Sequence, residues 1–271
     1  MLNIHNLREK KRKNTLKKKI GLIGFGFVGK YVYQKAIKEN FFDVGFIYDE
    51  NIPNVAEIKS SSVLESVKQI TDCMVDMIVE VASPIALKSM GKKIIEHADV
   101  MPFSMTAFSD EDFFNDLKKR AADKKHRIII PHGAIIGLDG IFDARDLIEH
   151  LTIISTKPAK KFGYKDGEIK DKVKIYEGNT FNACKKFPNV VNVHAAVAIS
   201  GIGFKNTKSV IIADPDTNAF THHIEVIGKG IKWNIDMESP AIGESAGAYP
   251  CESVYQSIKR ICLNQDELVL C

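Results

Sequence analysis

The chain has 271 residues, of which 45% are hydrophobic and 27% charged, as in ordinary soluble globular proteins. No apolar stretch approaches the roughly 20 residues that cross a bilayer, and the first residues lack the apolar region of a secretory signal. Five cysteines without a CxxC pair indicate neither a disulfide framework nor a zinc ribbon. We therefore expect a cytoplasmic protein of one large or two modest domains, without a membrane span or a metal site.

The formal charge of +4 is unevenly distributed along the chain. Residues 1–19 hold eight Lys and Arg against one Glu, which leaves 30 basic and 33 acidic residues, a charge of −3, for residues 20–271. The basic segment could contact nucleic acid or an acidic membrane surface. It has no interleaved aromatic residues to stack on bases, so we interpret it as a mobile, solvated extension and expect no specific nucleic-acid partner.

The first part of the body alternates apolar strands with helices. The sequence predicts strands at 19–25, 43–50, 74–82, 98–103 and 126–131, and helices at 27–40, 84–97 and 109–125. Ser83 and Pro84 are a typical helix start, since serine caps and proline fits the first turn. Strands that are apolar throughout are typical of parallel sheets with helices on both faces. We predict an α/β fold that begins with a Rossmann-type, doubly wound parallel sheet over residues 20–131.

Beyond residue 131 the pattern changes to strands separated by turn-rich stretches. Strands are predicted at 151–157, 209–215, 220–228 and 231–236, the last two forming a hairpin around residues 228–230, and an amphipathic helix is predicted at 249–264. This indicates an α+β domain with a mixed, largely antiparallel sheet over residues 132–248, which we assign to substrate binding and dimerisation. Residues 249–271 are predicted to be a helix and tail that pack back on the first domain.

A glycine-rich loop follows the first strand. Gly24, Phe25, Gly26, Phe27, Val28 and Gly29 match G-x-G-x-x-G, in which the glycines allow a tight turn, the approach of a pyrophosphate and close packing of helix on strand. Asp49 lies 23 residues past Gly26, at the end of the second strand, where a carboxylate binds the ribose hydroxyls and repels a 2′-phosphate. The sequence predicts a nicotinamide dinucleotide cofactor, NAD in preference to NADP.

Two adjacent histidines lie in the strand at 220–228. Side chains alternate along a strand, so His222 shares a face with Ile224 and Val226 and points inward, while His223 points outward. A single inward histidine is more often a satisfied core residue than a catalyst.

Several stretches together resemble the L-aspartate dehydrogenase family in their order along the chain. They are EVASPIAL (80–87), IIIPHGAIIGLDGIFDAR (128–145), STKPAK (155–160), IYEGNTFNACKKFPNVVNVHAAVAISGIG (175–203), VIIADP (210–215) and THHIEVIG (221–228). The resemblance implies NAD(P)-dependent oxidative deamination of L-aspartate to iminoaspartate, which hydrolyses to oxaloacetate and ammonia or feeds NAD biosynthesis. It also implies a homodimer that forms through the second half.

The resemblance assigns roles to individual residues. It places the catalytic histidine on His222 and cofactor contacts on Ala134 and Asn192, and we add Ala82 and Ser83 to the cofactor site. A histidine that titrates near neutrality can take and return the protons of the amino group. Asp214 either orients that imidazole or is an ordinary turn aspartate.

Three positions depart from the family pattern. His132 replaces a serine, Phe220 replaces an asparagine, and the family's asparagine-proline-basic-threonine-serine run is not recognisable in SPAIGESAGAYP (239–250). His132 either contacts the substrate or is a loop histidine, and Lys157 either binds a substrate carboxylate or is a solvated strand-end lysine. His194 lies two residues after Asn192, so on a helix it points elsewhere, and we interpret it as a packing residue or subunit contact.

Two alternatives to an aspartate dehydrogenase follow. One is a related NAD(P)-dependent oxidoreductase that acts on another amino or imino acid, which the altered 239–250 segment favours. The other is a non-catalytic NAD(H)-binding regulatory protein, against which the combination of a glycine-rich loop and His222 argues.

Overall fold

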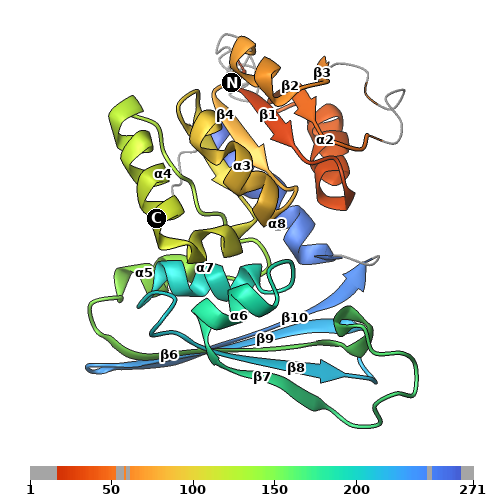
Figure 1. Cartoon of the computed structure of the whole chain (residues 1–271), viewed down its shortest axis with the longest axis vertical. Helices are drawn as coiled ribbons and strands as arrows, with labels where there is room; N and C mark the ends of the chain where they lie inside the picture. The colour runs from red at the N-terminus through yellow and green to blue at the C-terminus, as the bar shows by residue number, and fades with distance from the viewer. Residues whose placement is uncertain (1–16, 53–57, 59–61, 243–245, 264–271) are drawn as a thin grey trace, which may run out of the picture.

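The chain folds around two β-sheets with helices between and around them (Figure 1). The computed structural model describes residues 17–52, 58, 62–242 and 246–263. The N-terminal half builds the first sheet, drawn in red to yellow, and the second half builds the other, drawn in green to blue (Figure 1). The predicted extension over residues 1–19 lies almost wholly outside the described residues and stays a prediction, as does the division of the chain into domains.

The first sheet has five strands, all parallel, in the order β3-β2-β1-β4-β5. The strands are β1 (Lys19–Ile23), β2 (Asp43–Tyr48), β3 (Ser62–Leu64), β4 (Met77–Glu80) and β5 (Asp99–Pro102). The chain moves outward from β1 in one direction and then returns to add β4 and β5 on the other side. This order confirms the predicted doubly wound sheet and creates a switch point between β1 and β4, where such sheets bind nucleotides.

Helices cover both faces of this sheet because its strands are apolar on both sides. One face, with Ile20 and Leu22, packs against α2 (Phe27–Glu39) and α8 (Ala248–Leu263). The other face, with Ile78 and Val100, packs against α3 (Pro84–Ile95) and α4 (Glu111–Lys124). The helix α3 begins as predicted, with the Ser83 hydroxyl accepting a hydrogen bond from the Ala86 amide and Pro84 in the first turn.

The second sheet has six strands in the order β11-β10-β9-β6-β8-β7. They are β6 (Ile148–Pro158), β7 (Val173–Asn179), β8 (Lys208–Asp214), β9 (Ala219–Gly228), β10 (Ile231–Ile242) and β11 (Ala246–Gly247). Only β6 and β8 run parallel, so the sheet is mixed and largely antiparallel, as predicted. The β9–β10 hairpin is confirmed, and Gly230 supplies the positive φ of 74° that its turn requires.

Three short helices lie between the two sheets (Figure 1). They are α5 (Leu138–Asp143), α6 (Thr180–Lys186) and α7 (Asn192–Ser200), and they join one continuous core with the inner face of the second sheet. The apolar run that contains α7 needs no cover from a second subunit, because Ala195 and Val197 of α7 are fully buried within the chain itself.

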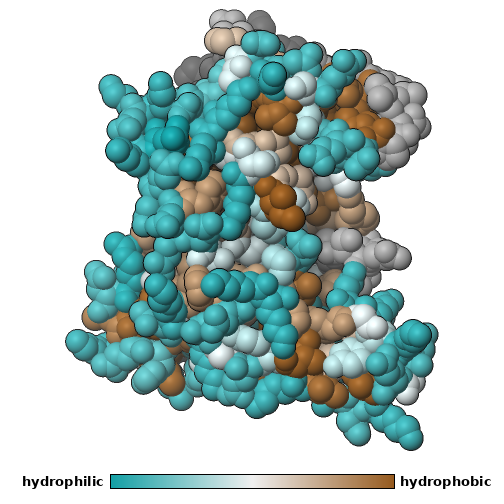
Figure 2. Space-filling model, in the orientation of Figure 1, coloured by the Kyte–Doolittle hydropathy of each residue, from teal (hydrophilic) through white to brown (hydrophobic). Residues whose placement is uncertain are grey.

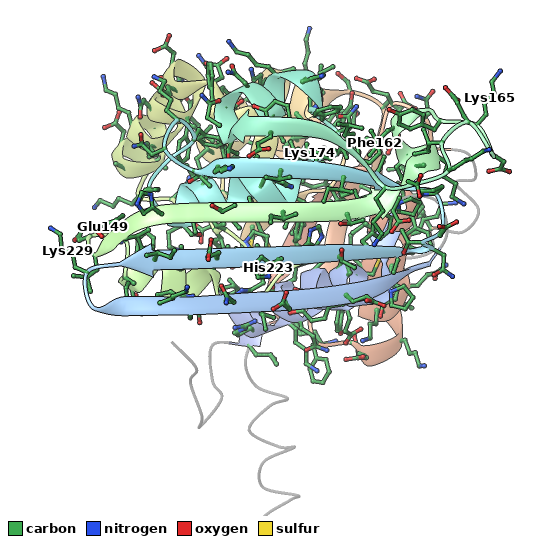
Figure 3. The ribbon with its side chains drawn as sticks, turned by 90° about the horizontal axis from the view of Figure 1, so that it is seen from below. Glu149, Phe162, Lys165, Lys174, His223 and Lys229 are labelled. Carbon is green, nitrogen blue, oxygen red and sulfur yellow. The ribbon has the colours of Figure 1, made fainter. Side chains whose placement is uncertain are left out.

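The outer face of the second sheet is open in the described part of the chain. Viewed from below, the six-stranded sheet faces the reader with no helix in front of it, and His223 lies on this face (Figure 3). Alternate residues of β6 point outward, among them Thr152, Ile154 and Thr156, and each is only partly buried.

Sequence patterns missed some elements and misjudged one. Residues 126–131 do not form a strand: a single bridge joins Ile128 to Val100. The short strands β3, β7 and β11 and the helices α5 and α6 were not predicted. The same holds for three 3₁₀ segments, η2 (Val67–Asp72), η3 (Met105–Ser109) and η4 (Ala159–Phe162). These elements are two to seven residues long, too short for a periodic pattern to appear.

The surface agrees with the composition. Hydrophilic residues cover most of the face seen in Figure 2, and apolar residues appear there in small groups. Among the described helices, none combines the length and the apolar composition that a membrane crossing needs. The four cysteines in the described part of the chain, Cys73, Cys184, Cys251 and Cys262, are all free.

Candidate active site

The glycine-rich loop connects β1 to α2 at the switch point of the first sheet. Gly24 has a φ of 98°, and a side chain there would meet the backbone of Ala82. A Cβ on Gly29 would lie 2.2 Å from the Gly24 carbonyl oxygen. A Cβ on Gly26, in contrast, would have no described neighbour within 4 Å, so the backbone there borders open space. Two of the glycines thus permit close packing and the third leaves room for a ligand.

This loop suits a pyrophosphate. Gly26 is the N-cap of α2 and offers no side chain to bond the free amides of the first turn. Those amides and the positive end of the helix dipole attract phosphate. Of the predicted loop contacts, Val28 lines the cavity described below, Phe27 is 43% exposed, and the Phe25 side chain is buried against Tyr33. The loop residues present therefore fit a dinucleotide, with Phe25 restricted to backbone contacts.

Asp49 follows β2 directly and lies beside this loop. One of its carboxylate oxygens accepts a hydrogen bond from the Phe25 amide at 2.5 Å, and the other accepts one from the Asn51 amide at 2.8 Å. The side chain thereby fixes the loop as well as presenting a negative charge where the ribose of a dinucleotide would lie.

A buried carboxylate that sequence reasoning missed organises the next loop. Glu80 ends β4 and is fully buried. Its carboxylate accepts hydrogen bonds from the amides of Ala82 at 2.8 Å and Ser83 at 2.9 Å, and from the Ser104 hydroxyl at 2.8 Å. Burial raises its pKa, which these bonds partly offset. The only signal in the sequence is an acidic residue at the end of the apolar strand MIVE.

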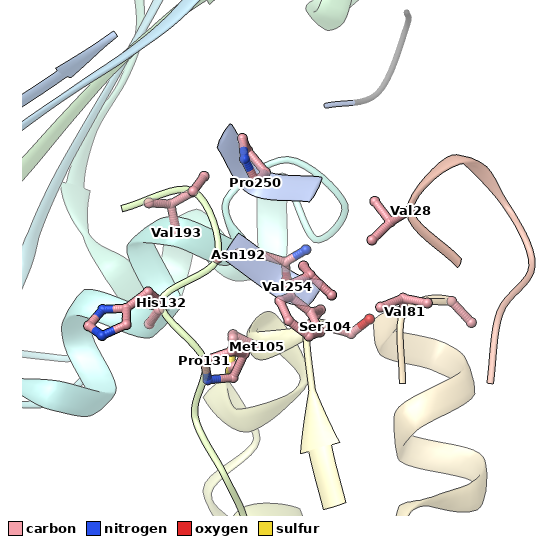
Figure 4. A pocket seen from close by; sticks show the side chains of 15 residues that line it. Val28, Val81, Ser104, Met105, Pro131, His132, Asn192, Val193, Pro250 and Val254 are labelled. Atoms are coloured by element: carbon pink, nitrogen blue, oxygen red, sulfur yellow. The ribbon is translucent and has the colours of Figure 1, made fainter. Parts of the chain in front are cut away.

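These loops enclose a cavity at the carboxyl edge of the first sheet (Figure 4). Val28 and Val81 lie on one side, Pro131 and His132 on the other, and Asn192, Ser104 and Val254 lie between them. Its lining is mainly apolar, as expected for a site that binds a planar ring, and includes Val28, Val81, Ala82, Phe103, Ser104, Met105, Pro131, His132, Gly133, Ala134, Asn192, Val193, Ala196, Pro250 and Val254.

The predicted cofactor contacts outside the glycine-rich loop and Asp49 lie at or beside this cavity. Ala82, Ala134 and Asn192 line it, and Ser83 follows as the cap of α3. The Asn192 side-chain oxygen accepts a hydrogen bond from the Thr106 amide at 3.1 Å. Its amide nitrogen has no partner among the described residues, so it is available as a donor to a ligand. His132 lines the cavity too, but its ring points away from Val28 and Val81 (Figure 4), and its buried Nδ1 has no hydrogen-bond partner among the described residues.

The two adjacent histidines point to opposite faces of the second sheet, as their strand positions predict. His222 is 5% exposed and faces α7, and its Nδ1 lies 2.7 Å from the Ser155 hydroxyl. His223 is on the outer face (Figure 3), where its Nδ1 lies 2.6 Å from a carboxylate oxygen of Asp236.

Lys157 lies on the same inner face as His222. It is only 8% exposed, so its interpretation as a solvated strand-end lysine is wrong. Its ammonium donates a hydrogen bond to the Val190 carbonyl and lies 5.8 Å from the centre of the Phe220 ring. Phe220, one of the departures from the family pattern, thus borders the lysine.

Burial and mutual charge shift the pKa values of this cluster. Burial, and then the positive charge of Lys161, lower the pKa of Lys157 to about 8. Burial, and then the charge of Lys157, lower the pKa of His222 to about 3. His222 is therefore a neutral imidazole near pH 7, the protonation state of a general base.

For two further side chains, the structure decides between the roles considered from sequence. Asp214 does not orient His222, because β6 separates its strand from β9. It pairs with Lys172 at 3.1 Å and accepts a hydrogen bond from the Asp216 amide, as a turn aspartate does. His194 is fully buried, which excludes a subunit contact, and its Nε2 lies 2.7 Å from the Ser155 hydroxyl.

Helix α7 connects the cavity to the histidine cluster. Its first residues, Asn192 and Val193, line the cavity, whereas His194 points to the second sheet and reaches Ser155. His222 and Lys157 do not line the cavity itself. Part of the altered segment, residues 243–245, lies outside the described residues. Among those described, no group of three His, Cys, Asp or Glu is placed to hold a metal ion.

Two family models match consecutive parts of the chain. A model described as the NAD binding domain of homoserine dehydrogenase matches residues 24–131. A model described as the C-terminal part of aspartate dehydrogenase matches residues 139–261.

Curated relatives and solved structures agree with these matches. An L-aspartate dehydrogenase of Nitrosopumilus maritimus is 34% identical over 233 residues, covering 78% of this chain and 84% of the relative. One of Methanocaldococcus jannaschii is 31% identical over 222 residues, covering 77% and 82%. A crystal structure of aspartate dehydrogenase from Thermotoga maritima has a TM-score of 0.76 at 24% identity and covers 94% of this chain and 100% of that one. A scyllo-inositol dehydrogenase of Lactobacillus casei, solved with bound NAD(H) and scyllo-inositol, shares the fold at a TM-score of 0.53 and 12% identity, covering 94% and 92%.

Proposed function

The chain belongs to the L-aspartate dehydrogenase family, and we propose that it oxidises L-aspartate to iminoaspartate, which hydrolyses to oxaloacetate and ammonia, or runs the reverse amination. As a member of that family it is an NAD(P)-dependent dehydrogenase that acts on an amino donor. One observation supports the reaction most directly: Lys157 and His222 share the inner face of the second sheet, under the helix that borders the nucleotide cavity.

Each half of the site has a distinct task. When bound, the nicotinamide accepts a hydride from the substrate α-carbon. Asn192 donates its amide hydrogens to the ligand in the cavity, and the apolar walls from Val81 and Val254 exclude water from it. The Lys157 ammonium binds a substrate carboxylate. His222 takes a proton at Nε2 from the substrate ammonium as the carbon–nitrogen double bond forms, and releases it to water. The neutral imidazole then takes a proton from the water that attacks the imine and gives it to the nitrogen that leaves as ammonia.

The low pKa of His222 is compatible with this role. Burial is the larger cause of the low pKa and the Lys157 charge the smaller one; a dicarboxylate substrate brings negative charge next to the imidazole and offsets the Lys157 charge. Substrate binding therefore raises the pKa of His222 toward the range useful for proton transfer. The cofactor is NAD rather than NADP in this proposal, because the Asp49 carboxylate opposes a 2′-phosphate.

The experiment that tests the function is a turnover assay of the purified protein with NAD and a panel of amino acids. L-aspartate should give the highest kcat/KM, with NADH and ammonia formed in equal amounts. L-glutamate is the informative comparison, since it has the same charges and one more methylene. If no NADH formed from aspartate and another amino acid were turned over, that amino acid and not aspartate would be the substrate.

We further propose that the active protein is a cytoplasmic homodimer, built through the open outer face of the second sheet. Partly buried β-branched residues line this face, among them Ile154 of β6, Ile212 of β8 and Ile227 of β9. A second copy would cover them. Sedimentation equilibrium should show a dimer at micromolar concentration, and Ile212→Glu should convert it to a monomer. A wild-type protein that stays monomeric would contradict the proposal.

A further inference from the structure

A row of buried hydrogen-bonding groups leads away from His222 into the protein. We call it the positioning chain and define it as the side chains of four residues, Ser155, His194, Ser209 and Thr180. Its links are His222 Nδ1 to Ser155 Oγ (2.7 Å), Ser155 Oγ to His194 Nε2 (2.7 Å), His194 Nδ1 to Ser209 Oγ (2.9 Å), Ser209 Oγ to Thr180 Oγ1 (2.8 Å) and Thr180 Oγ1 to the carbonyl oxygen of residue 207 (3.1 Å).

The sheet and α7 bring these groups together from distant parts of the sequence. Ser155 of β6 is directly paired with His222 of β9, and Ser209 comes from β8 on the other side of β6. His194 reaches down from α7 and lies between the two serines. All four members of the positioning chain are 0% exposed. Their polar hydrogens must therefore be donated to acceptors inside the protein and not to water.

The far end of the chain decides where the hydrogens lie. The carbonyl oxygen of residue 207 can only accept, so the Thr180 hydroxyl donates to it. The Thr180 oxygen then accepts from the Ser209 hydroxyl. Ser209 in turn accepts from Nδ1 of His194, which must carry a hydrogen there.

The same order continues to the active site. Neutral His194 with a hydrogen on Nδ1 has a lone pair on Nε2, and this nitrogen accepts from the Ser155 hydroxyl. Ser155 therefore accepts from Nδ1 of His222. His222 is left with its lone pair on Nε2, the nitrogen that has no partner among the described residues. In the reverse order the Thr180 amide would still donate to the carbonyl of residue 207 at 2.9 Å, but the Thr180 hydroxyl oxygen would face that carbonyl oxygen at 3.1 Å with no hydrogen between them.

We propose that the positioning chain sets the tautomer of His222, holding its hydrogen on Nδ1 and its lone pair on Nε2, where the substrate amino group delivers a proton. This inference rests on the proposed role of His222 as the general base. It assigns a function to His194, which is a positioning residue for the reaction and not a residue that merely fills the core. A hydrogen bond to one ring nitrogen is the usual means by which proteins fix the other.

The positioning chain cannot carry protons to solvent. It ends on a backbone carbonyl inside the protein, and none of its members is exposed. A proton taken up at Nε2 of His222 must therefore return to the substrate side, to the product or to water. The chain acts by orienting the base, and its loss should lower kcat with little change in cofactor binding.

The direct test is nitrogen NMR of the full-length protein with ¹⁵N-labelled histidine, at pH 7 and without ligands. The expected spectrum shows His222 and His194 both neutral and both with the hydrogen on Nδ1. Assignment uses His222→Asn and His194→Asn, each of which removes one set of signals. A spectrum in which His222 carries its hydrogen on Nε2 would overturn the inference.

Variants at the far end separate positioning from packing. Thr180→Val keeps the shape but removes the hydroxyl that orders the chain, so His222 should become a mixture of tautomers. We expect kcat to fall about tenfold, because a misplaced hydrogen forfeits part of the roughly 10²–10⁴-fold contribution of a general base. The KM for NAD should stay unchanged. Thr180→Ser keeps the hydroxyl, so this variant should have the wild-type kcat and a single His222 tautomer.

Residue 207 supplies a matched control. The Thr207 hydroxyl is buried and has no hydrogen-bond partner among the described residues, while its backbone carbonyl accepts from Thr180. Thr207→Val therefore removes a neighbouring buried hydroxyl and leaves the chain intact, so kcat and the tautomer should match wild type. If Thr180→Val and Thr207→Val lowered kcat equally, the positioning chain would contribute only to packing.

The outcomes distinguish this inference from the proposed function. If His222→Asn retains full turnover, His222 is not the base and the proposed role fails first. If His222→Asn abolishes turnover while Thr180→Val leaves kcat and the tautomer unchanged, only the positioning chain is refuted.

Discussion

Ser155 and His222 are directly paired on neighbouring antiparallel strands, and their side chains bond at 2.7 Å on the inner face of the sheet. The register of β6 and β9 therefore aims the imidazole, since a slip of one residue would bring His223 to this face instead. The backbone hydrogen bonds of the sheet hold the base in place, and α7 closes over it with His194.

His222→Asn should lower kcat by about 10² or more, the usual scale for losing a general acid or base. Asparagine can still donate to Ser155 from its amide nitrogen, but it offers no basic nitrogen to the substrate. The melting temperature and NAD affinity should therefore stay close to wild type. His223→Asn is the control on the outer face and should leave turnover intact. Normal turnover by a stably folded His222→Asn protein would end the assignment.

Lys157→Met should raise the KM for aspartate about tenfold to a hundredfold, on the scale of a lost charged hydrogen bond, while NAD affinity changes little. The pH dependence follows from its pKa of about 8 in the free protein. The ammonium is charged below this pH and neutral above it, so the wild-type KM should rise as pH increases beyond 8. The variant should lack that rise, as measured by initial rates over about pH 7 to 9.5, a range that spans this pKa and stays below the usual lysine value.

Lys161 provides a test of the same assignment from outside the site. Its positive charge helps to lower the pKa of Lys157. Lys161→Met should therefore move the rise in KM to higher pH without weakening aspartate binding at pH 7. A wild-type KM that is independent of pH in this range would show that Lys157 does not bind the substrate.

Much of this arrangement is visible in the sequence, for physical reasons. The glycine-rich loop and Asp49 could be predicted because they lie close together in the sequence, at the spacing that places both beside one nucleotide. The inward direction of His222 could be predicted from the alternation of side chains along a strand. The positioning chain was not predictable, because its members come from strands and helices that only the tertiary fold brings together. Glu80 was missed for a related reason: its donors include Ser104, on a loop that follows the neighbouring strand.

Glu80→Ala should lower both the melting temperature and NAD affinity. The substitution leaves the buried amides of Ala82 and Ser83 without an acceptor, and each such group costs about 1–3 kcal/mol. Since Ala82 also lines the cavity, the loop that contacts the cofactor loses its support. Thermal unfolding and NADH titration measure the two effects.

Glu96→Ala is the matched control for Glu80. Glu96 pairs with Arg120 at the surface, and exposed pairs of this kind contribute at most about 1 kcal/mol. This variant should bind NADH as wild type does. If Glu80→Ala bound NADH normally despite a lower melting temperature, the carboxylate would stabilise the fold without shaping the cofactor site.

The last prediction concerns cofactor choice. Wild type should use NAD with a kcat/KM at least about tenfold above that for NADP, because one unfavourable charge contact of about 1.4 kcal/mol is enough for that ratio. The carboxylate of Asp49 also accepts a bond from the Phe25 amide, so a simple truncation would disturb the phosphate loop as well. Asp49→Asn separates the two effects, since its amide oxygen can still accept from Phe25 while the charge is gone. Its NADP activity should therefore rise relative to NAD, whereas Asp49→Ala should weaken both cofactors. A wild-type protein that uses NADP as well as NAD would show that Asp49 does not face the 2′ position.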